Sequence, residues 1–170
     1  MKQVLETSNE QLKASDETKQ AVKDFLATHQ TGVLSTTDDD GGPRAAVVYF
    51  SVRDDFSITF ATKKETKKHT NLQRDPRAMF VVYEESSQST VQVQGHAEVI
   101  TDPGEAKRVI DQVANIASTT SESGELAVSK LEAGDFVAYQ LLPAQIRMAV
   151  FARPDPGGYD IFETIYFDAA

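Results

Sequence analysis

The residues best suited to chemistry in this sequence form a basic cluster, defined as the six cations Lys63, Lys64, Lys67, Lys68, Arg74 and Arg77. The same stretch holds only two acids, whereas the chain of 170 residues carries a net charge of −9. If the segment is helical from residue 64, lysines four positions apart repel one another, and a bound anion would relieve that repulsion. The first turn of a helix also attracts anions through its free backbone N–H groups. We therefore hypothesise that the cluster binds a small phosphate-bearing ligand.

Two other interpretations of the cluster are open at this point. A lysine run can be the solvated face of a helix, and it can bind nucleic acid, although a net charge of −9 disfavours non-specific binding to DNA or acidic membranes. Arg44 favours the phosphate hypothesis, because it begins an apolar strand beside Ala45 and Ala46, and small residues leave room for a planar ligand. Alternatively, Arg44 is an ordinary strand-edge cation beside the acidic turn 38–40.

Other kinds of chemistry find little support in the sequence. There is no cysteine, which excludes disulfides and thiolate catalysis, and the three histidines lack the spacing of metal ligands. Neither a glycine-rich nucleotide motif nor a nucleophile-elbow motif occurs. We therefore predict no metal site and name no catalytic residue.

Composition and the N-terminal residues bear on the cellular location of the protein. The hydrophobic share of 40% and charged share of 25% are typical of a globular protein, and no apolar run approaches the ~20 residues that span a membrane. The polar, acidic N-terminus is unlike a secretory signal. We expect a cytoplasmic protein that binds neither nucleic acid nor membrane.

Hydrophobic periodicity predicts the elements that must position the basic cluster. Helices are predicted over 8–30, 64–74 and 102–117, with a further helical turn at 125–131. Strands are predicted over 32–37, 44–52, 56–61, 77–83, 90–100, 136–142, 145–152 and 159–167. Pro143 is expected to end one strand, and Tyr49, Phe50, Phe80 and Tyr83 are expected in the core. Seven or eight strands without regular strand–helix alternation predict a mainly β (α+β) fold, an antiparallel barrel in one domain over 1–170.

The order of several segments is similar to that of a known family. The chain presents the strand GVLSTT, a Gly-Gly-Pro turn, a strand beginning RAAVVY, the segment FATKKETKKHTNLQRDPRAMFVV and the strand TVQVQGHAEVI. Over about residues 25–101 this order resembles the pyridoxamine 5′-phosphate oxidase-like FMN-binding split-barrel superfamily, most of all its general stress protein-like branch.

The resemblance implies a fold, a cofactor and an assembly. It implies an antiparallel split β-barrel with a few peripheral helices, of which residues 1–30 form an N-terminal helical segment. It further implies a homodimer with FMN at the subunit interface, acting as an FMN-dependent oxidoreductase on an unknown small molecule. A deazaflavin is the alternative cofactor, and a non-catalytic stress-response module that binds flavin or deazaflavin is the alternative function.

The resemblance also assigns residues by position to the two parts of FMN. Arg44 matches a strand-start arginine that contacts the flavin phosphate, and Lys67 and Lys68 match a basic pair that grips it. The remaining matches concern the flavin ring: Ala45, Ala46 and Val47 match the strand along it, and Ala61 and Thr62 match a strand-end pair that binds it. Thr90 falls where pyridoxamine phosphate oxidases have a flavin-contacting glutamine, so we expect that contact to be weaker or missing.

Two departures from the family narrow the expected activity. The chain has no tryptophan, and its C-terminal residues lack the Arg-x-His substrate motif of true pyridoxamine phosphate oxidases. No histidine follows His96, whereas the haem-handling relatives use a C-terminal one. We therefore do not expect oxidation of vitamin B6.

Overall fold

A computed structural model describes residues 14–120, 135–151 and 161–167 of the chain. Its first element is the helix α1, Asp16–Thr28. Ser15 caps this helix, because its hydroxyl accepts a hydrogen bond from the Thr18 N–H at 3.0 Å. Of the predicted helix over 8–30, residues 8–13 lie outside the described residues, and the helix ends two residues earlier than expected.

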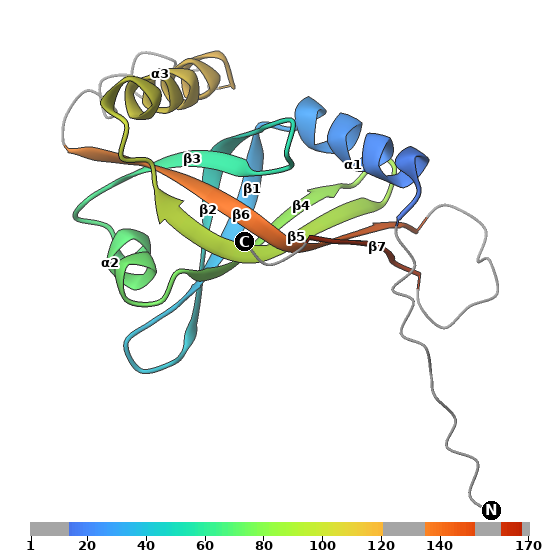
Figure 1. Cartoon of the computed structure of the whole chain (residues 1–170), viewed down its shortest axis with the longest axis horizontal. Helices are drawn as coiled ribbons and strands as arrows, with labels where there is room; N and C mark the ends of the chain where they lie inside the picture. Colours follow the sequence, from blue (N-terminus) through green and yellow to red (C-terminus); the bar gives the residue numbers. More distant parts are fainter. Residues whose placement is uncertain (1–13, 121–134, 152–160, 168–170) are drawn as a thin grey trace, which may run out of the picture.

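Seven strands follow in the described residues: β1 Thr31–Thr37, β2 Pro43–Val52, β3 Ile58–Lys63, β4 Arg77–Glu84, β5 Ser89–Val99, β6 Phe136–Val150 and β7 Glu163–Tyr166. All their pairings are antiparallel, in the order β3-β2-β1-β4-β5-β6-β7 (Figure 1). A further pairing of β3 with β6 closes the first six strands into a barrel. The predicted antiparallel split barrel is thus confirmed.

The barrel encloses one core built from aromatic and branched side chains. Phe50 and Phe80 meet edge to face with ring centroids 4.9 Å apart, and Phe60 stacks on Tyr139 at 5.3 Å. All four are fully buried. The prediction that Tyr83 joins this core was wrong, because strand side chains alternate and β4 already directs Phe80 and Val82 inward. Tyr83 instead points out and is 57% exposed.

The strand β6 corrects the prediction that Pro143 ends a strand. β6 runs without interruption through Pro143, which lies opposite Gly95 where the pairing of β5 with β6 shifts register. Proline has no N–H for the ladder, and a bulge is where such a residue is tolerated. A Cβ on Gly95 would lie only 1.9 Å from the Leu142 carbonyl oxygen, so glycine is required for this close approach.

The two later helices are α2, Lys67–Arg74, and α3, Pro103–Thr120. α2 begins three residues later than predicted, because Thr66 takes the N-cap position. Lys63 and Lys64 therefore precede the helix, and the expected repulsion between lysines four apart within it was wrong. The predicted helical turn at 125–131, and residues 152 and 159–160 of two predicted strands, lie outside the described residues.

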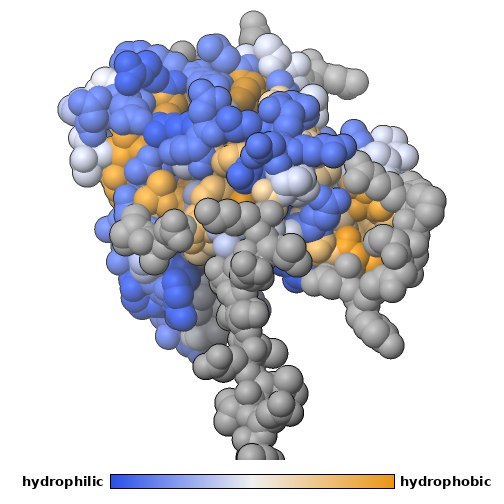
Figure 2. Space-filling model, turned by 45° about the vertical axis from the view of Figure 1, so that its right-hand side comes forward, coloured by the Kyte–Doolittle hydropathy of each residue, from blue (hydrophilic) through white to orange (hydrophobic). Residues whose placement is uncertain are grey.

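The surface combines charged and apolar regions. Hydrophobic residues reach the surface between hydrophilic ones on the face shown in Figure 2. In the part of the chain that the structure describes, no helix is both long and apolar enough to cross a membrane.

Candidate functional site

The barrel is split between β2 and β3. These strands pair only where Phe50–Val52 faces Ile58–Phe60. Beyond this contact, residues 43–49 of β2 continue to pair with β1, and residues 61–63 of β3 continue to pair with β6. Among the described residues, the edges of β2 and β3 that face each other across the split therefore have no ladder partner. Such edges present backbone N–H and C=O groups that can bind a ligand.

The start of α2 is tied to the end of β3 at one end of this split. The Thr62 and Thr66 hydroxyls are 2.9 Å apart, and Thr66 in turn accepts a hydrogen bond from the His69 N–H at 3.4 Å. Asn71 donates from Nδ2 to the Thr36 hydroxyl at 3.0 Å, and Arg74 donates to the Thr37 carbonyl at 2.6 Å. The N-terminus of α2, where backbone N–H groups lack intrahelical partners, is thereby fixed against the ends of β1 and β3.

Lys67 and Lys68 form the first turn of α2. Lys67 is exposed, whereas Lys68 is half-buried, and this burial lowers the pKa of the Lys68 ammonium. Neither lysine forms an ion pair with any residue that the structure describes. By contrast, Lys63 lies 3.9 Å from Glu65 and Lys64 lies 3.2 Å from Asp135. Of the four lysines, the two at the helix start are thus the ones without a neighbouring carboxylate.

Arg44 lies at the same end of the barrel as α2. It is paired with Thr36 across the β1–β2 ladder, and directly opposed strand residues point to one face. Its Nε donates to the buried Asp38 carboxylate at 2.5 Å. This ion pair agrees with the interpretation of Arg44 as a strand-edge cation beside the acidic turn. The Asp39 N–H, and after it Arg44, hold the pKa of Asp38 well below its usual range. Among the described residues the two terminal nitrogens of Arg44 make no hydrogen bond, so they can still bind an anion.

The structure distributes the residues assigned to the flavin ring over the split and beyond it. Ala45 and Val47 are exposed on the outer face of β2, and Ala46 is half-buried. Across the split on β3, Ala61 is half-buried and Thr62 is buried. Thr90 is not brought to this group, because it pairs with Tyr83 at the end of β4 that is remote from α2. Its buried hydroxyl donates to the Val82 carbonyl at 3.2 Å.

No pattern in the sequence indicated the contact between α2 and β6. The Tyr139 hydroxyl lies 2.8 Å from His69 Nδ1 and accepts from Gln73 Nε2 at 3.2 Å. Burial raises the pKa of the Tyr139 hydroxyl, so the phenol stays protonated and can donate as well as accept at this contact. The contact joins residues 70 positions apart, and no local pattern marks such a pair.

Comparison with known proteins gives the family. Residues 18–149 match the sequence profile of pyridoxamine 5′-phosphate oxidase. The chain belongs to this family. Family members commonly bind flavin. The structural neighbours include a heme binding protein from Mycobacterium smegmatis and PhzG from Burkholderia lata in complex with tetrahydrophenazine-1-carboxylic acid.

Individual relatives share the fold more than the sequence. The chain is 32% identical over 83 residues to pyridoxine/pyridoxamine 5′-phosphate oxidase of Cupriavidus necator. The matched segment covers 49% of this chain but only 39% of that relative. The structure of the conserved hypothetical protein Rv2991 from Mycobacterium tuberculosis superposes with a TM-score of 0.64 at 23% identity, covering 83% of this chain and 92% of that one. A Clostridium acetobutylicum protein related to general stress protein 26 gives a TM-score of 0.66 at 11% identity, covering 91% and 98%.

Proposed function

We propose that this protein binds FMN along the split between β2 and β3 and uses it as an oxidoreductase on a small molecule. The observation that supports this most is the edge of β2 over 43–49, which has no ladder partner among the described residues. It lies at the end of the barrel where α2 begins with Lys67 and Lys68. A flavin needs both features, a flat slot with backbone hydrogen-bonding groups and a cationic site for its phosphate. Bound flavin supplies the electron transfer, and the protein supplies binding, orientation and electrostatics.

The phosphate is assigned to the start of α2. A phosphate monoester carries about −1.5 to −2 charges at pH 7, which calls for two or three cations and free N–H donors. Lys67, Lys68 and the first-turn N–H groups meet this need, and the terminal nitrogens of Arg44 can add to it. The Lys68 ammonium has lost part of its hydration without gaining a carboxylate, so an anion there would restore its stabilisation.

The flavin ring is assigned to the edge of β2. Ala45, Ala46 and Val47 leave the backbone accessible because their side chains are small or directed outward. Ala61 and Thr62 lie on β3 just beyond its pairing with β2. Polar backbone groups can form hydrogen bonds with the polar edge of the ring system, and the apolar side chains can contact its flat faces.

We further propose that a second copy of the chain covers the outer face of β1, β2 and β4. Val47, Val33 and Val81 lie side by side across these strands, and Tyr83 follows two residues along β4 on the same face. Val47 is 69% exposed, Val33 38% and Tyr83 57%, an unusual concentration of exposed apolar side chains. A homodimer would bury this face, and it would place residues of the partner beside the flavin.

The test is titration of the protein with FMN, in which quenching of the flavin fluorescence measures binding. Arg44→Ala alone would leave the buried Asp38 carboxylate without its cation, so Arg44 is tested in the double variant Asp38→Asn with Arg44→Ala. This double variant combined with Lys68→Ala should bind FMN at least about a hundredfold more weakly at unchanged far-UV circular dichroism. Wild-type protein that shows no affinity for FMN would refute the proposal.

Turnover requires a separate measurement, because a flavin- or deazaflavin-binding stress-response module would contain the same site. The absorption spectrum of the purified protein and the mass of the released ligand distinguish FMN from a deazaflavin. Reduction of the bound flavin by NAD(P)H followed by reoxidation supports the oxidoreductase. Stable binding without reduction by any donor supports the module.

A further inference from the structure

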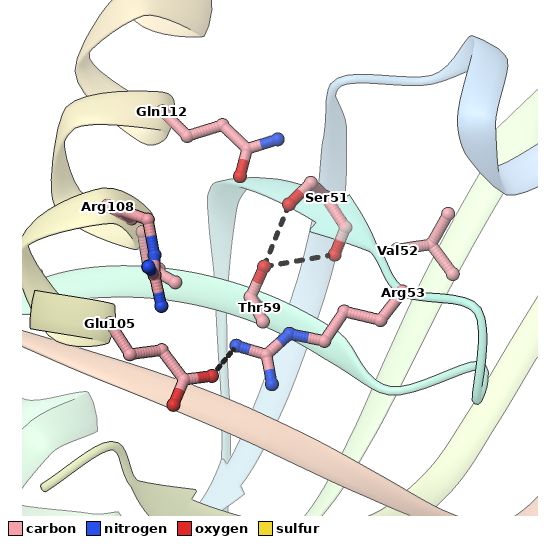
Figure 3. A pocket seen from close by; sticks show the side chains of 8 residues that line it. Ser51, Val52, Arg53, Thr59, Glu105, Arg108 and Gln112 are labelled. Carbon is pink, nitrogen blue, oxygen red and sulfur yellow. Dashed lines mark hydrogen bonds and ion pairs between the residues drawn. The ribbon is translucent and has the colours of Figure 1, made fainter. Parts of the chain in front are cut away.

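Apart from the split, a cavity lies outside the barrel, between α3 and the hairpin of β2 and β3. It has a volume of about 350 Å³ and is lined by Ser51, Val52, Arg53, Thr59, Glu105, Arg108, Val109 and Gln112 (Figure 3). This volume is at the small end of the range for ligand pockets, about 300–1,000 Å³. None of the nine residues assigned to the flavin lines the cavity.

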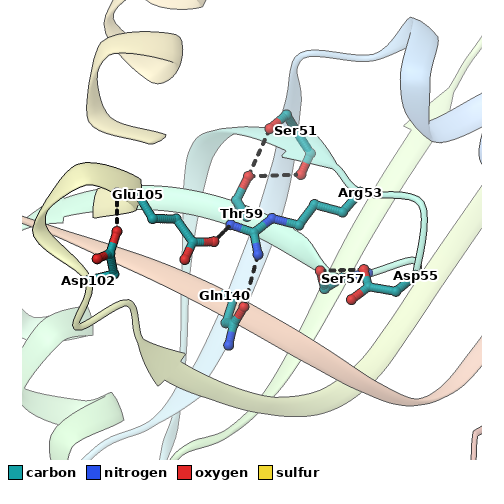
Figure 4. A network of polar contacts seen from close by, with 8 residues as sticks. All are labelled: Ser51, Arg53, Asp55, Ser57, Thr59, Asp102, Glu105 and Gln140. Atoms are coloured by element: carbon teal, nitrogen blue, oxygen red, sulfur yellow. Dashed lines mark hydrogen bonds and ion pairs between the residues drawn. The ribbon is translucent and has the colours of Figure 1, made fainter. Parts of the chain in front are cut away.

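One wall of the cavity is a guanidinium group held in place from two sides. Arg53 forms an ion pair with Glu105 of α3 and donates from Nη1 to the Gln140 amide oxygen of β6 at 3.1 Å (Figure 4). Glu105 is itself positioned by Asp102, whose carboxylate accepts the Glu105 N–H at 2.7 Å. Because the partners come from different elements, the orientation of Arg53 is set before any ligand binds.

The opposite wall offers groups that are still available for a ligand. Arg108 forms no hydrogen bond or ion pair with any residue in the described parts of the chain, and it lies on the same side of α3 as Glu105 and Gln112 (Figure 3). The Ser51 and Thr59 hydroxyls also line the cavity and bond to each other at 2.8 Å, which leaves lone pairs that can accept further hydrogen bonds. Val52 and Val109 add apolar surface. The lining therefore has one cation without a partner, hydroxyl and amide groups, and two apolar side chains.

We propose that this cavity binds a small hydroxylated monocarboxylate. Its two arginines and one glutamate leave one net positive charge, which matches a monoanion, in a chain whose own charge is −9. A phosphate monoester, with nearly two negative charges, would exceed this single positive charge and leave the cavity with an excess of negative charge. The free guanidinium of Arg108 binds the carboxylate through two parallel hydrogen bonds. The hydroxyls and Gln112 bind the ligand hydroxyls, and the valines contact its carbon chain.

The first test compares ligands that carry the carboxylate, the hydroxyls or both, by calorimetric titration of the full chain. Gluconate and glycerate carry the carboxylate and the hydroxyls, sorbitol carries the hydroxyls alone, and hexanoate carries the carboxylate alone. We expect gluconate or glycerate to bind at least about tenfold more tightly than sorbitol and hexanoate, since each lacks one set of contacts. If neither hydroxy acid binds, or if sorbitol or hexanoate binds equally well, the proposal is wrong.

The second test uses the hydroxy acid that binds and three variants of α3. Arg108→Ala should weaken binding at least about tenfold, and Arg108→Lys should weaken it less, because the charge stays but the paired hydrogen bonds are lost. Lys107→Ala is the matched control and should bind as the wild type does, since Lys107 is paired with Asp111 on the exposed surface. Alanine is favourable in a helix, and Arg108 has no described partner to lose, so all three variants should fold.

FMN affinity separates this inference from the proposed function. Arg108→Ala should leave FMN affinity unchanged, whether or not the flavin proposal holds. Unchanged hydroxy-acid binding in Arg108→Ala would overturn the inference and leave the flavin site untouched. A parallel loss of FMN and hydroxy-acid affinity in this variant would overturn the assignment of a cavity separate from the flavin residues.

Discussion

Replacing Lys68 by methionine should move apoprotein stability and FMN affinity in opposite directions. Lys68 is half-buried at the start of α2, burial lowers its pKa, and no described carboxylate pairs with it. Methionine keeps most of the length of the side chain and removes the charge that the site desolvates. Because the half-buried ammonium is still partly solvated, the free energy of unfolding of the apoprotein should rise by at most about 1 kcal/mol, or at most about 4 °C in the melting temperature.

The same substitution should weaken FMN binding by about 10- to 150-fold. The proposed contact is one charge-assisted hydrogen bond to the phosphate, worth about 1.5–3 kcal/mol. The pH dependence gives an independent check on the sign. A lysine whose folded pKa is depressed binds fewer protons in the native state than in the unfolded state. The stability of the wild-type apoprotein should therefore rise with pH as it approaches the unfolded pKa of about 10.4, and Lys68→Met should lack that rise.

Thermal unfolding with and without FMN, together with fluorescence titration, measures these effects. Lys107→Met is the control, because this exposed lysine of α3 is not among the residues assigned to FMN. It should change neither quantity by more than about 0.5 kcal/mol. A less stable apoprotein with unchanged FMN affinity would mean that Lys68 is a packing residue. A loss of both would mean that the substitution damages α2 itself.

Three further perturbations test the scaffold. Gly95→Ala should lower the free energy of unfolding by about 3 kcal/mol, because the new Cβ would overlap the Leu142 carbonyl. The loss should appear as a lower urea midpoint, and an unchanged midpoint would contradict the close approach. Asp38 has a depressed pKa and so stabilises the fold above its unfolded pKa of about 3.9, and that stability is lost as pH falls toward the folded value. Wild type should accordingly lose more stability than Asp38→Asn between pH 5 and pH 3, and equal losses would argue against the pair with Arg44. Thr66→Ala should cost about 1 kcal/mol through the lost cap of α2, while Thr66→Ser should cost little in the same unfolding assay.

Local pattern was sufficient for the class of fold and for most of its strands. β5 shows why, since its alternating apolar residues Val91 and Val93 occupy the inside of the barrel as the period-two pattern predicts. The ordered motifs around Arg44 and the basic cluster also led to the family, which the sequence profile over residues 18–149 confirms. These features depend on residues near one another in the chain, so one sequence contains them.

Local pattern failed where a distant partner decided the outcome. Pro143 was expected to end a strand, but its place opposite Gly95 in the bulge lets β6 continue. Tyr83 is an aromatic residue of a type common in protein cores. The side of the sheet that it occupies nevertheless depends on which face the other strands enclose. The site residues assigned from the resemblance stay a prediction, and the titrations above test them.

Local propensity and periodicity were enough to predict most strands and the residue types available for anion binding. The closure of the barrel and the position of its split depend instead on tertiary contacts. Ile58 pairs with Leu141, and β2 pairs with β3 only from Phe50 to Val52, through contacts between segments that are separate in sequence. The split beside α2 and the cavity beside α3 both result from those pairings, since backbone edges and side chains become a site only when the sheet brings them together.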